Sequence, residues 1–192
     1  VLDREEGLRG EGLLSHVAVL HSPHVDRMLL LTDGAITPAP DLSQKVQMVQ
    51  NAVRIARRLG VLIPKVAPLA AVEVVNPAMQ ATVDAALLTM MNRRGQIQDC
   101  VIDGPLAMDL ALSQEAARRK GIQSDVAGRA DILLFPAIEA ANSVLKTFTF
   151  AGDSLFGGLV AGAAAPIVLS SRADSEDSKL YSIACAASVA GA

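Results

Sequence analysis

Residues 28–72 read MLLLTDGAITPAPDLSQKVQMVQNAVRIARRLGVLIPKVAPLAAV, and this stretch decides the fold class. A short apolar run is followed by Gly and Pro residues, and then by apolar side chains that recur every three or four positions, which predicts a helix. Asp41 and Gln44 have the spacing of a capping box at the start of this helix, and Gly60 is expected to end it. A second apolar run, Lys65–Val72, completes a strand–helix–strand unit.

The same alternation continues on both sides of this unit. The runs Leu14–Leu20 and Met28–Thr32 are joined by a loop that contains Pro, which predicts an antiparallel hairpin. Strands separated by helices favour parallel pairing, with helices covering both faces of the sheet. The sequence therefore predicts an α/β protein with three α/β/α layers, in which a mainly parallel sheet carries one antiparallel hairpin. Further strands are expected over 100–102, 132–135 and 166–169, and further helices over 77–94, 106–119, 138–150 and from Asp174 or Ser175 onward.

Two of these helices have apolar side chains at helical spacing, which we expect to face the core. One starts at Asn76-Pro77, where Asn caps the helix and Pro fits its first turn, and the other is the last helix of the chain. The side chains expected to be buried are Met79, Val83, Leu87 and Met90 in the first helix, and Leu180, Ile183, Ala184 and Ala187 in the second.

The composition narrows the functional classes. The 192 residues are 51% hydrophobic and carry a formal net charge of −3, which excludes a disordered chain and disfavours a basic nucleic-acid-binding face. The longest uncharged apolar stretch, 155–169, is shorter than the roughly 20 residues of a membrane helix, and the charged N-terminus has no signal-peptide pattern. Cys100 and Cys185 lie outside any zinc pattern, which predicts free thiols in a reducing, cytoplasmic compartment.

Polar side chains gather where predicted strands give way to helices. Ligands of parallel sheets bind beyond the carboxyl ends of the strands, so the junctions 72–76, 103–105, 136–142 and 170–177 are candidate sites. The last junction, Ser-Ser-Arg-Ala-Asp-Ser-Glu-Asp, is the densest. Arg172 and the N–H groups of a helix start suit phosphate, although an ordinary capped helix with an acidic first turn explains the same residues. Likewise, Glu139 and Asn142 suit either substrate orientation or capping, and Asp103-Gly104-Pro105 suits either a ligand or a turn.

Three segments carry a family resemblance: Leu14-Ser-His-Val-Ala-Val19, Val101-Ile-Asp-Gly-Pro-Leu106 and Pro166-Ile-Val-Leu-Ser-Ser-Arg-Ala-Asp174. They resemble the phosphate acetyl/butyryl transferases (phosphotransacylases), most closely the butyryl branch. The resemblance implies two α/β/α domains, related in fold to isocitrate and isopropylmalate dehydrogenases, with the active site in the cleft between them. It also implies an N-terminal truncation: residues 1–13 would be a remnant of the first domain, 14–169 the second domain, and 170–192 a C-terminal helix that returns toward the first domain and the cleft.

The resemblance also implies roles for individual residues. Arg172 would hold the phosphate, and Ser171 would hydrogen-bond the reacting acyl phosphate. The family's general base aligns with Ser178, so we expect Asp177, with Asp174 in reserve, to take its place. The residues expected to bind substrate are Asp103, Gly104, Pro105, Glu139, Asn142 and Asp174.

Two further positions depart from the family pattern, in addition to Ser178. Ala141 stands where the family has Gly, and its methyl group would crowd a backbone approach to a ligand. Pro68 falls within the predicted strand 65–72, where it lacks the N–H group that a sheet requires, so we expect an edge, a bulge or the end of the strand there.

We therefore expect a phosphate acyltransferase that converts a short-chain acyl-CoA, such as butyryl-CoA, and phosphate into acyl phosphate and CoA. Coenzyme A is then a substrate; no cofactor is expected to be tightly bound, and no metal, because His16, His21 and His24 lack the spacing of a zinc site. Ala- and Gly-rich stretches over 155–165 and 184–192 predict a homodimer, without nucleic-acid or membrane partners. Two alternatives stay open: a metal- and NAD(P)-dependent decarboxylating dehydrogenase of related fold, and a non-catalytic dimerising domain that binds CoA.

Overall fold

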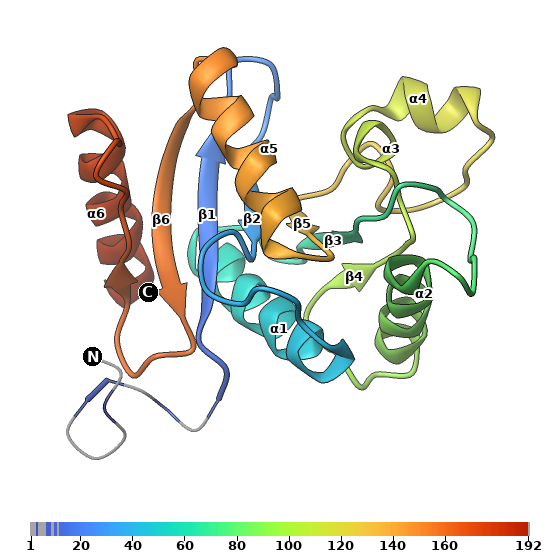
Figure 1. Cartoon of the computed structure of the whole chain (residues 1–192), viewed down its shortest axis with the longest axis horizontal. Helices are drawn as coiled ribbons and strands as arrows, with labels where there is room; N and C mark the ends of the chain where they lie inside the picture. Colours follow the sequence, from blue (N-terminus) through green and yellow to red (C-terminus); the bar gives the residue numbers. More distant parts are fainter. Residues whose placement is uncertain (1–2, 4–6, 9, 11, 192) are drawn as a thin grey trace.

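A seven-stranded sheet runs through the computed structural model, which describes residues 3, 7–8, 10 and 12–191. The strand order is β4-β3-β5-β2-β1-β6-β7. The strands are β1 (Ser15–His21), β2 (Leu29–Thr32), β3 (Lys65–Pro68), β4 (Val101–Ile102), β5 (Ile132–Leu134), β6 (Leu155–Ala161) and β7 (Ile167–Val168). The helices are α1 (Leu42–Arg58), α2 (Gln80–Arg93), α3 (Met108–Leu112), α4 (Gln114–Arg119), α5 (Ile138–Ala151) and α6 (Glu176–Gly191). In Figure 1, α6 lies beside β6, and α2, α3 and α4 gather at the other side of the molecule, near β3 and β4.

The sheet has a parallel and an antiparallel part. The strands β2, β5, β3 and β4 are parallel to one another, which confirms the predicted parallel core. The predicted hairpin is also confirmed, because β1 pairs antiparallel with β2 and places Ala18 opposite Leu31. The antiparallel part is larger than expected, since β6 pairs antiparallel with β1, and β7 with β6.

Sequence patterns do not predict β6, although it has seven residues and pairs with β1 along its whole length, from Ser15 opposite Ala161 to His21 opposite Leu155. Gly157 and Gly158 weaken the strand pattern, because Gly has low strand propensity. Five of its seven residues are buried, so the polar–apolar alternation of a half-exposed strand is missing.

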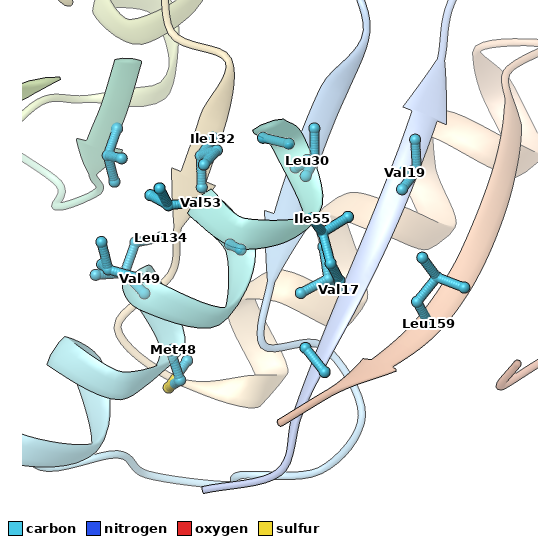
Figure 2. Packing of buried hydrophobic residues seen from close by; sticks show 14 of the residues in the cluster. Val17, Val19, Leu30, Met48, Val49, Val53, Ile55, Ile132, Leu134 and Leu159 are labelled. Atoms are coloured by element: carbon cyan, nitrogen blue, oxygen red, sulfur yellow. The ribbon is translucent and has the colours of Figure 1, made fainter. Parts of the chain in front are cut away.

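Helices cover both faces of the sheet, as predicted for three layers. Val17 and Val19 of β1 point to one face and pack with side chains of α1, whereas Ala18 and Leu20 point to the other face and pack with side chains of α3, α4 and α5. Figure 2 shows Met48, Val49, Val53 and Ile55 of α1 directed at the strands, with Val17, Leu30, Ile132, Leu134 and Leu159 around them. The core is mostly aliphatic, with Phe135 and Phe156 as its buried aromatic residues among those described, and the sheet separates its two halves.

Helix α1 forms as the sequence predicts. The Asp41 carboxylate accepts the Gln44 N–H at 2.8 Å, and the Gln44 side chain accepts the Asp41 N–H at 2.9 Å, which completes the capping box. Beyond the end of the helix, Gly60 has a φ of +97°, a conformation that favours glycine. Early in α1, Lys45 forms a buried ion pair of 2.5 Å with Asp84 and thereby ties α1 to α2.

The predicted start and buried face of α2 are wrong. The helix begins at Gln80, because the Asn76 side chain accepts the Ala78 N–H at 2.9 Å and forms a turn ahead of the helix instead of capping it. Leu87 and Met90 are exposed, and the core-facing side consists of Thr82, Asp84, Ala85, Leu88 and Thr89. The threonine hydroxyls on this side bond to nearby backbone carbonyls; for example, the Thr89 hydroxyl donates to the Ala85 carbonyl at 2.9 Å. Asp84 instead pairs with Lys45 of α1.

Two further predicted elements are shorter than expected. The helix predicted over 106–119 is divided into α3 and α4 at Ser113, whose backbone is extended and whose hydroxyl accepts the Ala116 N–H at 3.2 Å and so caps α4. The strand predicted over 65–72 ends at Pro68, where β3 is last paired with β5. This is one of the outcomes that Pro68 predicts.

The last helix, α6, buries small side chains rather than the predicted apolar face. Leu180 and Ile183 are exposed, whereas Ser178, Ser182 and Cys185 are buried. Gly157 of β6 explains this choice, because a Cβ atom there would lie 3.1 Å from the Ser182 Cα. Helix and strand therefore approach closely, and the Ser182 hydroxyl accepts the Gly158 N–H at 3.1 Å.

The loop after β2 is organised by one buried carboxylate. Asp33 is 1% exposed, and its Oδ1 accepts the N–H groups of Ala35 at 2.8 Å and Ile36 at 2.9 Å. Its Oδ2 accepts the N–H groups of His16 at 3.1 Å and Thr37 at 3.2 Å. Four backbone donors thus converge on one side chain and tie the loop to the start of β1.

We predict that Asp33→Asn lowers the free energy of unfolding by about 2–4 kcal/mol, because the amide replaces an accepting oxygen with a donor that faces buried N–H groups. Urea denaturation measures the change. The control is Asp125→Asn, an exposed position at which no comparable loss is expected. Equal stabilities of the two variants would contradict this account of the loop.

Candidate functional site

The predicted phosphate-binding residues lie in the segment between β7 and α6, residues 169–175, which we call the β7–α6 turn. The Asp174 carboxylate accepts the Ser171 N–H at 2.5 Å, and the Ser171 carbonyl accepts the Asp174 N–H at 3.2 Å. The Ser171 hydroxyl in turn accepts the Ala173 N–H at 3.3 Å. Ser171 and Asp174 therefore hold the turn closed, with Arg172 at its tip.

Arg172 is exposed, and within the described part of the chain no carboxylate pairs with it. A guanidinium group presents several N–H donors in one plane, which match the oxygens of phosphate. The geometry thus leaves the donors of Arg172 available to an anion from solvent.

The β7–α6 turn lies against the face of β6 that also packs with α5. Gly158 makes this approach possible, because a Cβ atom there would collide with the Leu169 carbonyl oxygen. On the same face, the Nζ atom of Lys146 in α5 lies 3.9 Å from Asp174 Oδ1 and 5.8 Å from the centre of the Phe156 ring. The Asp174 side chain is 4% exposed, although its neighbours in the turn are exposed.

His16 lies beneath this arrangement, at the start of β1. Its side chain packs between Gly34 and Gly158, it is 3% exposed, and its Nδ1 has no hydrogen-bond partner in the described structure. Burial lowers the pKa of His16, a shift that Asp33 and Asp174 oppose and Lys146 reinforces. The imidazole is therefore neutral at pH 7, and its electrostatic neighbours come from the β2–α1 loop, the β7–α6 turn and α5.

Some predicted site residues join this arrangement. Asn142 lies one turn before Lys146 in α5, and its amide donates to the Gly34 carbonyl at 3.0 Å, next to His16. Glu139 is exposed in the first turn of α5. Ala141, which replaces the family's Gly, is 1% exposed and packs in the core.

The junction 103–105 lies elsewhere. Asp103, Gly104 and Pro105 follow β4, which is one edge strand of the sheet, whereas Ser171 and Arg172 follow β7, the other edge strand. The Asp103 carboxylate lies 3.7 Å from Arg93, and the Gly104 carbonyl accepts from the Thr89 hydroxyl at 3.3 Å. Within this chain, five strands separate these residues from the turn.

The rule that selected 170–177, that ligands bind beyond the carboxyl ends of parallel strands, does not apply to this segment, because β7 is an antiparallel strand. Because β6 and β1 are antiparallel, as are β1 and β2, β6 runs parallel to β2. The strand β7 is antiparallel to β6, so its carboxyl end points away from the edge where β2, β3, β4 and β5 end. The β7–α6 turn is placed instead by Gly158 and by the ion pair with Lys146.

The two candidate bases have different surroundings. Asp174 already accepts from Ser171 and pairs with Lys146, whereas Asp177 is exposed in the first turn of α6. Asp177 lines a hollow of about 600 Å³ together with Ser154 and Tyr181. The cap of α6 is Ser175, whose hydroxyl accepts the Ser178 N–H at 3.2 Å, and Ser178 itself is buried.

The cysteine side chains do not supply a nucleophile. Both are free, as predicted, and burial together with the negative charge of Asp99 raises the pKa of Cys100 to about 11. Burial also raises the pKa of Cys185, against the opposing effect of a hydrogen bond with Tyr181. Both thiols therefore stay protonated near neutral pH. In the described ranges, no three His, Cys, Asp or Glu side chains form a group that could hold a metal ion, and no helix has the length and hydrophobicity to span a bilayer.

Comparison with known proteins decides the family. The model of the family described as phosphate acetyl/butaryl transferase matches residues 1–187. The chain belongs to this family. It is 53% identical over 191 residues to the phosphate butyryltransferase of Clostridium acetobutylicum, a match that covers 100% of the chain and 64% of that relative.

Solved structures agree with this assignment. A branched-chain phosphotransacylase from Enterococcus faecalis V583 superimposes with a TM-score of 0.90 at 37% identity, over 98% of this chain and 67% of that one. A putative 4-hydroxythreonine-4-phosphate dehydrogenase from Salmonella typhimurium shares the fold at 17% identity, with a TM-score of 0.52 over 92% of this chain and 54% of that one. Because the chain spans less than two thirds of the length of its butyryltransferase relative, the activity of the whole protein is taken up below as a proposal.

Residue patterns alone did not single out Lys146, and they weighed His16 only as a metal ligand. The sole signal for Lys146 is its place one helical turn after Asn142, because its contact with Asp174 spans 28 positions of the sequence. The importance of His16 depends on burial by Gly34 and Gly158, which no local pattern reveals.

The lowered pKa of His16 predicts how stability depends on pH. Below the ordinary value of 6.5, the unfolded chain takes up a proton that the folded chain resists, so stability falls as the pH drops through 6.5 and is unaffected by this group above it. Urea denaturation at pH 7.5, 6.5 and 5.5 measures this slope. We expect His16→Gln to flatten it and the exposed-site control, His24→Gln, to leave it unchanged; the same slope in both variants would contradict the prediction.

Proposed function

We propose that this chain supplies the phosphate-binding side of a phosphate acyltransferase, which converts a short-chain acyl-CoA and phosphate into acyl phosphate and CoA. The observation that carries the proposal is the closed β7–α6 turn in a chain of the phosphate acetyl/butaryl transferase family; this turn presents Arg172 with no carboxylate partner among the described residues. The names of its relatives, a phosphate butyryltransferase and a branched-chain phosphotransacylase, favour a short acyl group. They give no support to the dehydrogenase alternative.

In the direction that forms acyl-CoA, the CoA thiol loses its proton and attacks the acyl carbonyl carbon of the acyl phosphate. The carbon–sulfur bond forms as the bond to the phosphate oxygen breaks, and phosphate leaves with the bonding electron pair. Arg172 binds the phosphate oxygens and stabilises their increasing negative charge, and the Ser171 hydroxyl donates a hydrogen bond to the same group. The Ser171 hydroxyl accepts in the turn and therefore keeps its own proton for this donation.

A base is useful in this reaction, because a free thiol has a pKa of about 8.5 and is mostly protonated at neutral pH. We assign the base to Asp177, whose carboxylate is exposed, while both oxygens of Asp174 are engaged by Ser171 and Lys146. Asn142 and Glu139, at the start of α5, are assigned to the same substrate cleft. Asp103, Gly104 and Pro105 require a more distant part of the CoA molecule, since they follow the opposite edge strand.

We further propose the domain organisation and assembly. Residues 14–169 form the second of two domains, and 170–192 return toward the first domain; the predicted remnant 1–13 falls mostly outside the described residues. For the relation to dehydrogenases that the resemblance implies, the support is a shared fold with a putative 4-hydroxythreonine-4-phosphate dehydrogenase. Exposed Leu180 and Ile183 on α6 support a homodimer, and the two free thiols support a cytoplasmic location.

The test is CoA release from butyryl-CoA in the presence of phosphate, measured with the intact protein that contains this chain. Arg172→Gln is expected to lower kcat about 10²–10³-fold, the effect of removing a charge-stabilising donor. The control is Arg94→Gln, at the end of α2 near the other edge of the sheet, which is expected to keep full activity. No turnover by the unsubstituted protein, or equal turnover by both variants, would refute the proposal.

A further inference from the structure

Each oxygen atom of the Asp174 carboxylate has its own interaction partner. Its Oδ2 accepts the Ser171 N–H and so fixes the β7–α6 turn, and its Oδ1 faces the Lys146 Nζ at 3.9 Å. The carboxylate is almost completely buried, at 4% exposure. A buried carboxylate is stable only with a compensating positive charge or hydrogen bonds. The conformation of the turn therefore depends on the groups that compensate the charge of Asp174.

Lys146 is the nearest cation to this carboxylate among the described residues. Its ammonium group lies 5.8 Å from the centre of the Phe156 ring, within the range of a cation–π interaction, and Phe156 is itself buried in β6. The Lys146 side chain is 46% exposed, and its ammonium group contacts both the Phe156 ring and the Asp174 carboxylate. An exposed ion pair contributes little to stability, but here one partner is shielded from water and the interaction is screened less.

His16, which interacts electrostatically with Asp174, and Asp33, which interacts with His16, do not replace this cation. His16 is buried and neutral, and Asp33 is already saturated by four backbone N–H groups. Without Lys146, the buried Asp174 carboxylate would keep no ion pair among the described residues. It would then be drawn toward solvent, and its bond to the Ser171 N–H would weaken.

We infer that Lys146 is a positioning residue of the phosphate site: through Asp174 it fixes the β7–α6 turn and thereby the orientation of Ser171 and Arg172. This inference rests on the proposed function for its catalytic consequence. Lys146 acts through the turn and not by contact with substrate, so its loss weakens the use of phosphate and leaves the use of acyl-CoA unchanged.

The kinetic test compares Lys146→Met, which keeps the length of the side chain without its charge, with Lys146→Arg. In the intact protein, we expect Lys146→Met to raise the KM for phosphate about tenfold, with the KM for butyryl-CoA within about twofold of the original, and Lys146→Arg to restore most of the loss. The matched control is Lys120→Met, which removes ion pairs of 3.6 Å and 3.9 Å to Glu73 and Asp109, distant from the turn. It is expected to change neither constant. An unchanged KM for phosphate, an equal rise in both KM values, or no rescue by Arg would overturn the inference.

A second measurement decides the inference without any activity. Amide hydrogen exchange of Ser171 and Ala173 reports the opening of the turn, and we expect Lys146→Met to speed it about tenfold, Lys146→Arg to have a small effect and Lys120→Met to have none. If the unsubstituted protein shows no turnover, the proposed function fails, and these exchange rates still test the positioning of the turn. Unchanged exchange in Lys146→Met would overturn the inference even in an active enzyme.

Discussion

The rest of the structure depends on how closely three segments approach β6. Gly157 lets the backbone of α6 lie against one face of this strand, and Gly158 lets the Leu169 carbonyl approach the other. Side chains at these positions would push α6 and the β7–α6 turn away in opposite directions. The strand also pairs with β1 along its whole length. The position of β6 therefore determines where α6 and the β7–α6 turn lie relative to the parallel part of the sheet. Arg172 and Ser171 are placed by this packing and not by the carboxyl edge of the parallel strands.

The predictable part of the fold is the part encoded by local patterns. The capping box at Asp41, the stop at Gly60 and the hairpin of β1 and β2 need only neighbouring residues, and the structure confirms them. The strand β6 and the buried face of α6 were not predictable in this way. Both depend on the close approach of Gly157 to Ser182, which lie 25 positions apart in the sequence. A search for large apolar side chains selected Leu180 and Ile183, since a face made of serine and cysteine has no such signal.

The candidate site likewise contains residues that a local sequence motif predicts and residues that only the structure brings together. Ser171, Arg172 and Asp174 were found through a continuous motif, and the family to which the motif points is confirmed. The structure adds what lies beneath that motif: Lys146 from α5 and His16 from β1, brought together by burial and charge. It also separates Asp103, Gly104 and Pro105 from the turn, because β4 and β7 are opposite edge strands, and the place of β7 depends on β6, which the sequence patterns did not reveal. The residue types therefore indicated the chemistry of the site. The positions of these residues relative to one another could be known only from the order and direction of the strands.

The two outermost strands of the sheet, β4 and β7, are only two residues long. A strand at the border of a sheet exposes unpaired N–H and C=O groups, and long borders of this kind recruit strands from other molecules. Here each edge strand has too few unpaired backbone groups to act as a template for a strand from another molecule. The short edge strands β4 and β7 thereby protect this aliphatic protein from aggregation through continued strand addition.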